Sequence, residues 1–127
     1  NAAVTQLQAL PSDVPVLVAL HHPPVPPASD SFWSENCLAQ PNRLMDALGG
    51  LAPRIKLLIH GHLHADFEAA GQGGFPIFCA PSTCHQYCLD TKDAEVDKGA
   101  QPGYRVLHLN SDGSFTTEVM RVAVEGA

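Results

Sequence analysis

Basic residues are scarce in this chain. Its 127 residues include 7 lysines and arginines against 13 aspartates and glutamates, which gives a net charge of −6. Nucleic acids and anionic membrane surfaces attract basic faces, so this balance argues against both as partners. No apolar run approaches the roughly 20 residues of a membrane span, and no secretory signal is visible. We therefore expect a cytoplasmic protein with neither a nucleic-acid polymer nor a membrane as its partner.

Cysteine is also scarce, and its four positions leave alternatives open. Because no secretory context accompanies them, we expect Cys37, Cys79, Cys84 and Cys88 to be reduced. The last three, Cys79, Cys84 and Cys88, could instead form a zinc site with His85, although their spacing differs from the Cys-x2-Cys of zinc ribbons. A cysteine nucleophile paired with His85 is a further alternative.

An initiator methionine is absent, and we interpret residues 1–2 as the remnant of a cleaved tag and leave them out of the fold. The content of 45% apolar and 16% charged residues is ordinary for a globular protein. The length corresponds to one domain, so residues 1–127 are expected to form a single unit.

Two continuous apolar runs, at residues 14–20 and 55–59, predict buried strands of a parallel sheet. Between them, helical spacing of apolar residues predicts an amphipathic helix over 41–48, with proline at its first position. This order predicts a βαβ unit. A proline-rich loop precedes the helix, and its Phe32 and Trp33 either line a substrate site or pack beneath the loop.

The second half of the chain has an antiparallel pattern. Residues 66–70 and 75–80 flank a glycine-rich turn, and residues 104–109 and 114–124 flank a second turn, so each pair predicts a hairpin. Residues 90–99 are charged and poor in apolar residues, and we expect them to be mobile. The fold class is therefore α/β, a mixed sheet with a βαβ unit followed by antiparallel hairpins.

Histidines follow both predicted parallel strands. His21 comes directly after the first strand, and His62 and His64 follow the second, with Gly61 expected to allow a sharp turn between. Ligands bind beyond the carboxyl ends of parallel strands, and neighbouring strands lie only about 5 Å apart. We therefore expect these three imidazoles to converge closely enough to share, or nearly share, a metal ion.

Five segments in this order, LHHPP (20–24), GHLH (61–64), APSTC (80–84), PGYRVL (102–107) and DG (112–113), give the chain a family resemblance. It resembles the calcineurin-like metallophosphoesterases, in particular the bacterial class III cyclic-nucleotide phosphodiesterases. The resemblance implies an αββα sandwich with two divalent ions (manganese, iron or zinc) that hydrolyses phosphodiesters, among them 3′,5′-cyclic nucleotides.

The resemblance also assigns roles to residues. His21 and His62 resemble ligands of one ion and His64 a ligand of the other, while His22 and Gly61 would lie beside the ligands without binding. The family's earlier motifs, of the forms D-x-H, G-D and G-N-H-[ED], do not occur in this chain. The bridging aspartate and the proton-donating histidine are thus missing, and the chain resembles only the C-terminal half of such a domain.

Two expectations follow for the isolated chain. Three neutral imidazoles bring no negative charge to offset two dications, so we expect no phosphodiesterase activity. The alternative function is a non-catalytic metal-binding or interaction module. Since the predicted helices cover one face of the sheet, the other face would expose an apolar patch, and we expect self-association, most simply as a two-fold homodimer.

Overall fold

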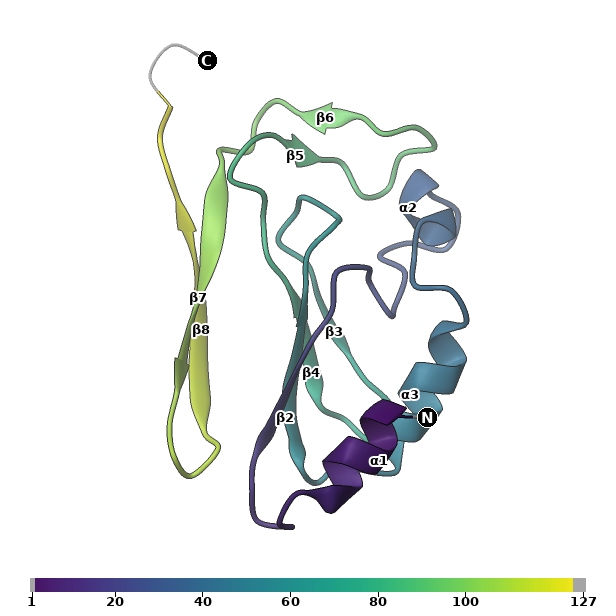
Figure 1. Ribbon diagram of the computed structural model, residues 1–127. Coiled ribbons are helices and arrows are strands. Elements are labelled where there is room, and N and C mark those ends of the chain that lie inside the picture. Colours follow the sequence, from purple (N-terminus) through teal and green to yellow (C-terminus); the bar gives the residue numbers. More distant parts are fainter. Residues whose placement is uncertain (1, 125–127) are drawn as a thin grey trace.

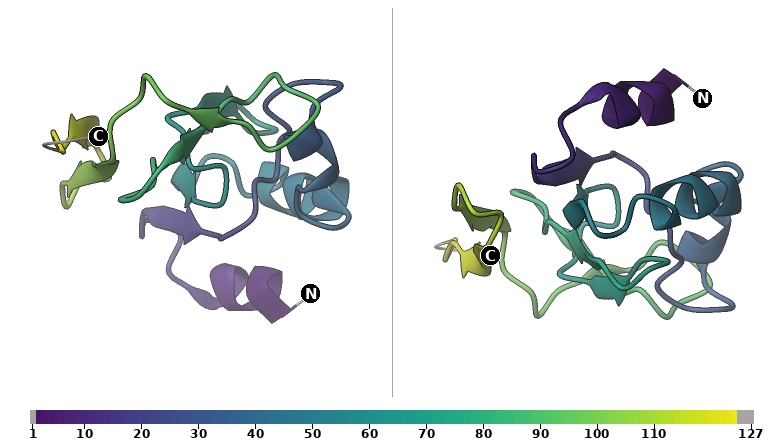
Figure 2. Two further views of the ribbon diagram at one scale, coloured as in Figure 1. Left: turned by 90° about the horizontal axis from the view of Figure 1, so that it is seen from above. Right: turned by 90° about the horizontal axis from the view of Figure 1, so that it is seen from below.

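The computed structural model describes residues 2–124 (Figure 1). Of the two residues interpreted as a tag remnant, Asn1 lies outside the described residues, whereas Ala2 begins helix α1. The chain divides into three layers, which Figure 1 shows from the side and Figure 2 shows from above and below.

A four-stranded mixed sheet forms the central layer. Its strands lie in the order β1 (Val16–Ala19), β2 (Ile55–His60), β4 (Pro76–Cys79) and β3 (Glu68–Ala70). β1, β2 and β4 are mutually parallel, and β3 runs antiparallel to β4. This confirms the α/β class, the mixed sheet and the βαβ unit.

Helices α1 (Ala2–Ala9) and α3 (Pro41–Gly49) lie on one side of this sheet (Figure 1). Met45 and Leu48 of α3 are buried against Leu58 and Ile77 of the sheet. The helix predicted over 41–48 is confirmed to within one residue. Its 3.6-residue spacing places the apolar side chains of α3 on one face. No helix among residues 2–124 combines the length and apolarity needed to cross a membrane.

The terminal hairpin, β7 (Gly103–Leu109) and β8 (Phe115–Arg121), forms the third layer on the opposite side of the sheet (Figure 2). Arg105 holds it there: its Nε donates to the Cys79 carbonyl at 3.0 Å, and its guanidinium pairs with Asp66. The Phe115 ring packs 6.0 Å from that of Phe78. The hairpin therefore covers part of the face that the sequence left open.

Two loop regions contain short elements that the sequence did not predict. The loop with the two aromatic residues contains a helical turn, α2 (Phe32–Glu35), in which Trp33 is buried and donates from Nε1 to the Cys88 carbonyl at 3.0 Å. Trp33 therefore packs beneath the loop. Residues 90–99 contain β6 (Val96–Asp97), which pairs with β5 (Gln86–Tyr87). Both elements are too short for a periodic pattern to reveal them.

The glycine-rich segment between β3 and β4 is a turn, as expected. Gly73 and Gly74 have φ of 92° and 89°, values that a residue without a Cβ adopts without strain. A Cβ on Gly73 would also lie 2.3 Å from that of Ala52. The segment thus needs glycine for backbone reasons, and because it has no lysine and leads into strand β4 instead of a helix, it lacks the features of a phosphate loop.

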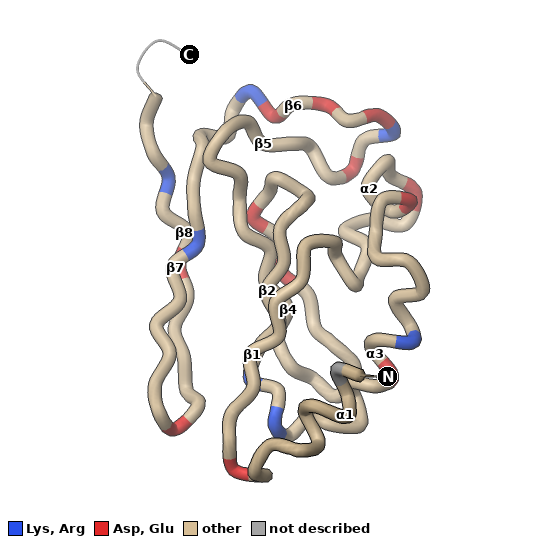
Figure 3. Tube along the Cα trace, viewed as in Figure 1, with Lys and Arg blue, Asp and Glu red and all other residues tan. Residues whose placement is uncertain are grey.

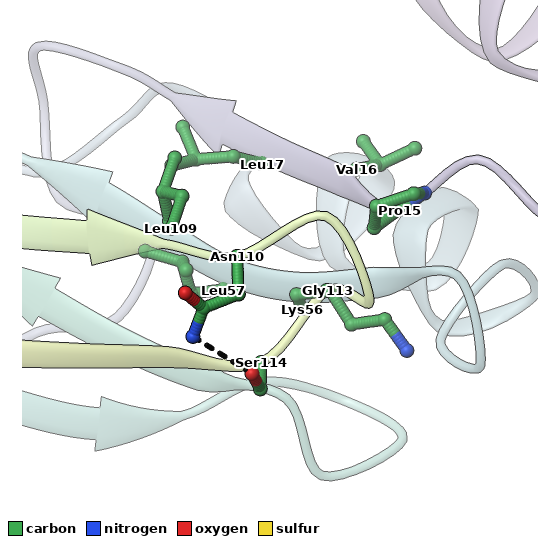
Figure 4. Close-up of a pocket in the computed structure, with 9 residues that line it drawn as sticks. All are labelled: Pro15, Val16, Leu17, Lys56, Leu57, Leu109, Asn110, Gly113 and Ser114. Atoms are coloured by element: carbon green, nitrogen blue, oxygen red, sulfur yellow. Dashed lines mark hydrogen bonds between the residues drawn. The ribbon is translucent and has the colours of Figure 1, made fainter.

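A small cavity of about 70 Å³ lies where the β7–β8 turn meets the beginnings of β1 and β2 (Figure 4). Pro15, Leu57 and Leu109 contribute to its walls, and Asn110 donates from Nδ2 to the Ser114 hydroxyl at 2.9 Å beside it. The cavity lies at the amino ends of β1 and β2, whereas His21 and His62 follow their carboxyl ends, so the two places are at opposite ends of the sheet.

Candidate metal centre

The carboxyl ends of β1 and β2 bring two histidine-bearing loops to one edge of the sheet. Backbone pairing continues beyond both strands: the Leu20 amide donates to the Ile59 carbonyl at 3.0 Å, and the Gly61 amide to the His21 carbonyl at 3.2 Å. His21 and His62 therefore leave the sheet as neighbours, in the place where parallel sheets bind ligands.

Three imidazoles meet at this edge. His62 Nδ1 lies 3.3 Å from His21 Nε2, and the His22 ring centroid lies 4.4 Å from that of His62. One nitrogen from each of the three lies within 4.8 Å of the others. Two nitrogens bound to a tetrahedral zinc at about 2.0–2.1 Å are themselves about 3.3 Å apart. His21 and His62 are thus already spaced to share an ion.

The sharp turn after β2 is made by the histidines themselves. His62 and His64 have φ of 68° and 49°, in the left-handed region that non-glycine residues rarely adopt. Gly61 does not have a positive φ, and a Cβ there would meet nothing closer than His21 Nδ1 at 4.0 Å. The expectation that Gly61 supplies the turn is wrong. The left-handed backbone conformation, with a strain on the order of 1 kcal/mol per residue, is adopted by His62 and His64 instead.

His62 is held neutral by its surroundings. Burial lowers its pKa, and the adjacent imidazoles of His22 and His21, followed by His64 and His60, lower it further. Its Nε2 is buried and has no hydrogen-bond partner within the described part of the chain. A neutral imidazole is what a divalent metal requires of a histidine ligand, and the nitrogen of His62 that faces His21 is Nδ1 rather than this buried Nε2.

His64 lies outside this three-histidine group. Its ring stands 5.2 Å from that of Tyr87 and 5.3 Å from that of His85, and its Nδ1 is buried without a partner among the described atoms. Of the three predicted ligands, the structure therefore brings together His21 and His62 and sets His64 to one side. His22, expected only beside the ligands, joins the group instead.

His60, the remaining histidine of this stretch, points inward. It is 3% exposed, and its Nδ1 lies 3.0 Å from the Gly61 carbonyl oxygen. Burial lowers its pKa, while the contact with that carbonyl acts weakly in the opposite direction. Its position in the last residue of β2, rather than in the loop, separates it from the three-histidine group.

The donor set fits one ion better than two. Across residues 2–124 the group consists of imidazoles and includes no carboxylate. Neutral nitrogen ligands suit zinc, iron and, less well, manganese. A pair of dications about 3.5–4 Å apart needs bridging negative charge, which these three side chains do not supply.

The alternative zinc site is wrong. Cys79, Cys84, His85 and Cys88, all within the described residues, do not gather their ligand atoms in one place. Cys79 is fully buried and its thiol donates to the Gly61 carbonyl at 3.3 Å, whereas Cys84 is exposed. The loop after β4 carries Cys84 to the surface, away from the buried Cys79. Residues that are close along the chain therefore do not bring their ligand atoms together.

No protein-family model matches the chain. It is 32% identical over 118 residues to a 3′,5′-cyclic-nucleotide phosphodiesterase of Nostoc, an overlap of 93% of this chain and 42% of the relative. It is 38% identical to the 3′,5′-cyclic adenosine monophosphate phosphodiesterase CpdA of Pseudomonas aeruginosa and 36% identical to that of Escherichia coli K12, each over 84% of this chain and 38% of the relative.

Over most of its length the chain is thus similar to bacterial cyclic-nucleotide phosphodiesterases. This confirms the resemblance seen in its histidine motifs. The chain spans about two fifths of the length of these curated relatives. The relationship therefore concerns part of such an enzyme, and the three-histidine group lies within that part.

Proposed function

We propose that this chain carries part of the metal centre of a class III phosphodiesterase, which in its complete form hydrolyses phosphodiesters such as 3′,5′-cyclic nucleotides. The observation that carries the proposal is the 3.3 Å separation of His21 Nε2 and His62 Nδ1 at the ends of adjacent parallel strands. The relatives named as cyclic-nucleotide phosphodiesterases support the substrate class.

In this proposal His21 and His62 hold one divalent ion, and His64, which lies apart from them, contributes to a second. His22 is close enough to complete the first ligand set. A bound divalent ion supplies Lewis-acid polarisation of a phosphoryl oxygen and acidifies water. The chain's own contribution is to hold neutral imidazoles at fixed positions on the edge of a rigid sheet.

The proposed complete domain is the αββα sandwich of the family. Residues 2–124 provide one helical layer, the mixed sheet and a β-hairpin layer across from it (Figure 1). The second layer of the sandwich would be built on this hairpin, whose two strands pair with each other and with no other strand among the described residues.

The chain by itself should bind a metal ion without turnover. Its site lacks the bridging carboxylate and the proton donor that two-metal hydrolysis of a phosphodiester needs. The test is to incubate the purified chain, loaded with manganese or zinc, with cyclic AMP and with bis(p-nitrophenyl) phosphate. We expect metal to be retained and no hydrolysis to occur. Hydrolysis that disappears in a His62→Ala variant would contradict this proposal.

We also propose that the isolated chain forms a homodimer through the outer face of the hairpin. Tyr104 and Met120 are cross-strand partners and are 46% and 41% exposed. They alternate with Arg105, which faces the sheet, so they point away from it. Paired apolar side chains on such a face favour a two-fold contact.

Light scattering at micromolar concentration tests the dimer. The chain should have about twice the monomer mass, and Met120→Glu should be monomeric because a carboxylate would be placed in the contact. A Glu118→Gln variant, on the same face, serves as the control and should remain dimeric. A monomeric unsubstituted chain would refute the proposal.

A further inference from the structure

The loop that follows β4 carries a thiol to which the metal centre gives no role. Of the four cysteines, Cys84 is the exposed one, whereas Cys79 is buried and Cys37 and Cys88 are partly buried. Burial raises the pKa of the Cys79 thiol to about 11 and raises that of Cys37 as well. The chain therefore presents one cysteine to solvent and shields the others to different degrees.

This loop is held in a fixed shape by a buried side chain. Gln86 is 2% exposed; its Oε1 accepts from the Ser82 amide at 3.1 Å, and its Nε2 donates to the Ser82 carbonyl at 2.7 Å. The Cys84 amide donates to the Ser82 hydroxyl at 3.0 Å. The sulfur is thus carried by an ordered loop.

The Cys84 sulfur has an imidazole beside it. Sγ lies 3.4 Å from His85 Nδ1, and His85 Nε2 lies 2.9 Å from the Tyr87 hydroxyl. Both contacts are satisfied when Nε2–H donates to the hydroxyl oxygen and Nδ1 accepts from the thiol. Tyr87 then orients His85, and His85 is in position to take the proton of the thiol.

The thiol and the imidazole also line an open cavity of about 430 Å³. The cavity is also lined by Asp97 of β6 and by Lys98, Gln101 and Pro102 of the segment that follows it. Figure 3 shows charged residues of both signs near β6. The cavity is large enough for a small polar group attached to the sulfur, and its lysine and glutamine offer hydrogen-bond donors to a carboxylate on that group.

We propose that Cys84 is a modification site that reacts with small disulfides bearing carboxylates and holds the resulting adduct in this cavity. As the sulfur attacks, His85 Nδ1 accepts the thiol proton, a bond forms between Sγ and one sulfur of the disulfide, and the disulfide's own S–S bond breaks. The released thiolate takes the proton, so the products are a mixed disulfide and one free thiol. The exchange needs no metal ion, although His85 and Tyr87 pack against the ring of His64.

Oxidised glutathione is the probe for this site. The reduced 127-residue chain is treated with it, digested, and analysed by mass spectrometry over time. We expect one glutathionyl group per chain, located on Cys84, to form at least about tenfold faster than on Cys37 or Cys88. Cys84→Ser should lose this fast adduct, and Cys88→Ser, the matched control, should retain it. Adducts spread evenly over the cysteines would overturn the proposal.

The role of His85 is tested by the rate with which Cys84 reacts. His85→Gln should slow the reaction by about tenfold in the folded chain, and Tyr87→Phe should slow it less, because it removes only the orienting hydroxyl. In urea all variants should react at the same rate, which separates positioning from an intrinsic effect on the thiol. Circular dichroism confirms that each variant is folded. If Cys84 reacts no faster in the folded chain than in urea, the proposal is wrong.

Discussion

The ends of β2 and β4 form an instructive pair. Both strands are parallel, they are neighbours in the sheet, and each is followed by a loop rich in histidine or cysteine. At the end of β2, the imidazole of His62 converges with those of His21 and His22 in the loop after β1. At the end of β4, Cys79 turns inward, and Cys84 points to solvent.

The difference comes from where the ligand candidates leave the sheet. His21 and His62 each follow a different strand by two residues, and the Gly61 amide joins their two loops through the His21 carbonyl. Cys84 and Cys88 lie five and nine residues beyond Cys79, on either side of β5, so that neither directly follows a strand of the four-stranded sheet. Convergence on one ion thus depends on two adjacent strands more than on residue type.

The largest effect that separates the two ends should be on metal affinity. His62→Ala removes the central imidazole of the group and should weaken zinc binding by about a hundredfold or more, since even residues behind ligands change affinity by 10–100-fold. Cys88→Ser should leave the affinity unchanged. Competition with a chromophoric chelator measures both variants. Equal losses in the two would show that both ends bind metal.

Low pH should destabilise the metal-free chain because of two histidines at the carboxyl end of β2. Burial depresses the pKa values of His60 and His62 in the folded state below the unfolded value of about 6.5. Between the folded and unfolded pKa values the unfolded chain binds more protons, so the free energy of unfolding falls as the pH falls below about 6.5.

Urea unfolding at several pH values between 7.5 and 5 measures this dependence. His62→Asn should make it shallower, because asparagine does not titrate and tolerates the left-handed backbone of that position. Cys84→Ser, at the end of the other strand, should keep the full dependence on pH. An unchanged slope in His62→Asn would contradict the buried, neutral assignment of that histidine.

The smallest effect should come from Gly61→Ala. Since Gly61 has no positive φ and a Cβ there has space, the free energy of unfolding should change by no more than about 0.5 kcal/mol. Gly73→Ala is the contrasting control: with a φ of 92° and a clash at Ala52, it should cost more than about 1 kcal/mol. Comparable losses in the two would mean that Gly61 is needed for the turn.

Sequence patterns predicted the elements that repeat over several residues. The apolar runs gave β1 and β2, and the helical spacing gave α3. They missed α2 and the β5–β6 pair, whose four and two residues are too few for a period to repeat. Such elements depend on tertiary contacts, such as the bond from Trp33 to the Cys88 carbonyl.

For the candidate site, the sequence predicted the edge of the sheet but not the full grouping. The positions of His21 and His62 after two parallel strands were sufficient to expect them to meet. No pattern of residues indicated that His22 would turn toward them, because neighbouring residues in an extended loop normally point in opposite directions. The left-handed backbone at His62 and His64 likewise falls on residues for which no sequence rule predicts it.

The attachment of the β7–β8 hairpin has a dynamic consequence. No backbone ladder joins it to the four-stranded sheet within residues 2–124; its contacts include those of Arg105, the packing of Phe115 on Phe78, and a single bond from the Gly103 amide to the Ser82 carbonyl at 2.8 Å. It can therefore open as a unit while the sheet stays intact. In native-state hydrogen exchange, amides of β7 and β8 should exchange through a lower-energy opening than those of β2. Each such opening would briefly expose the underside of the sheet to water.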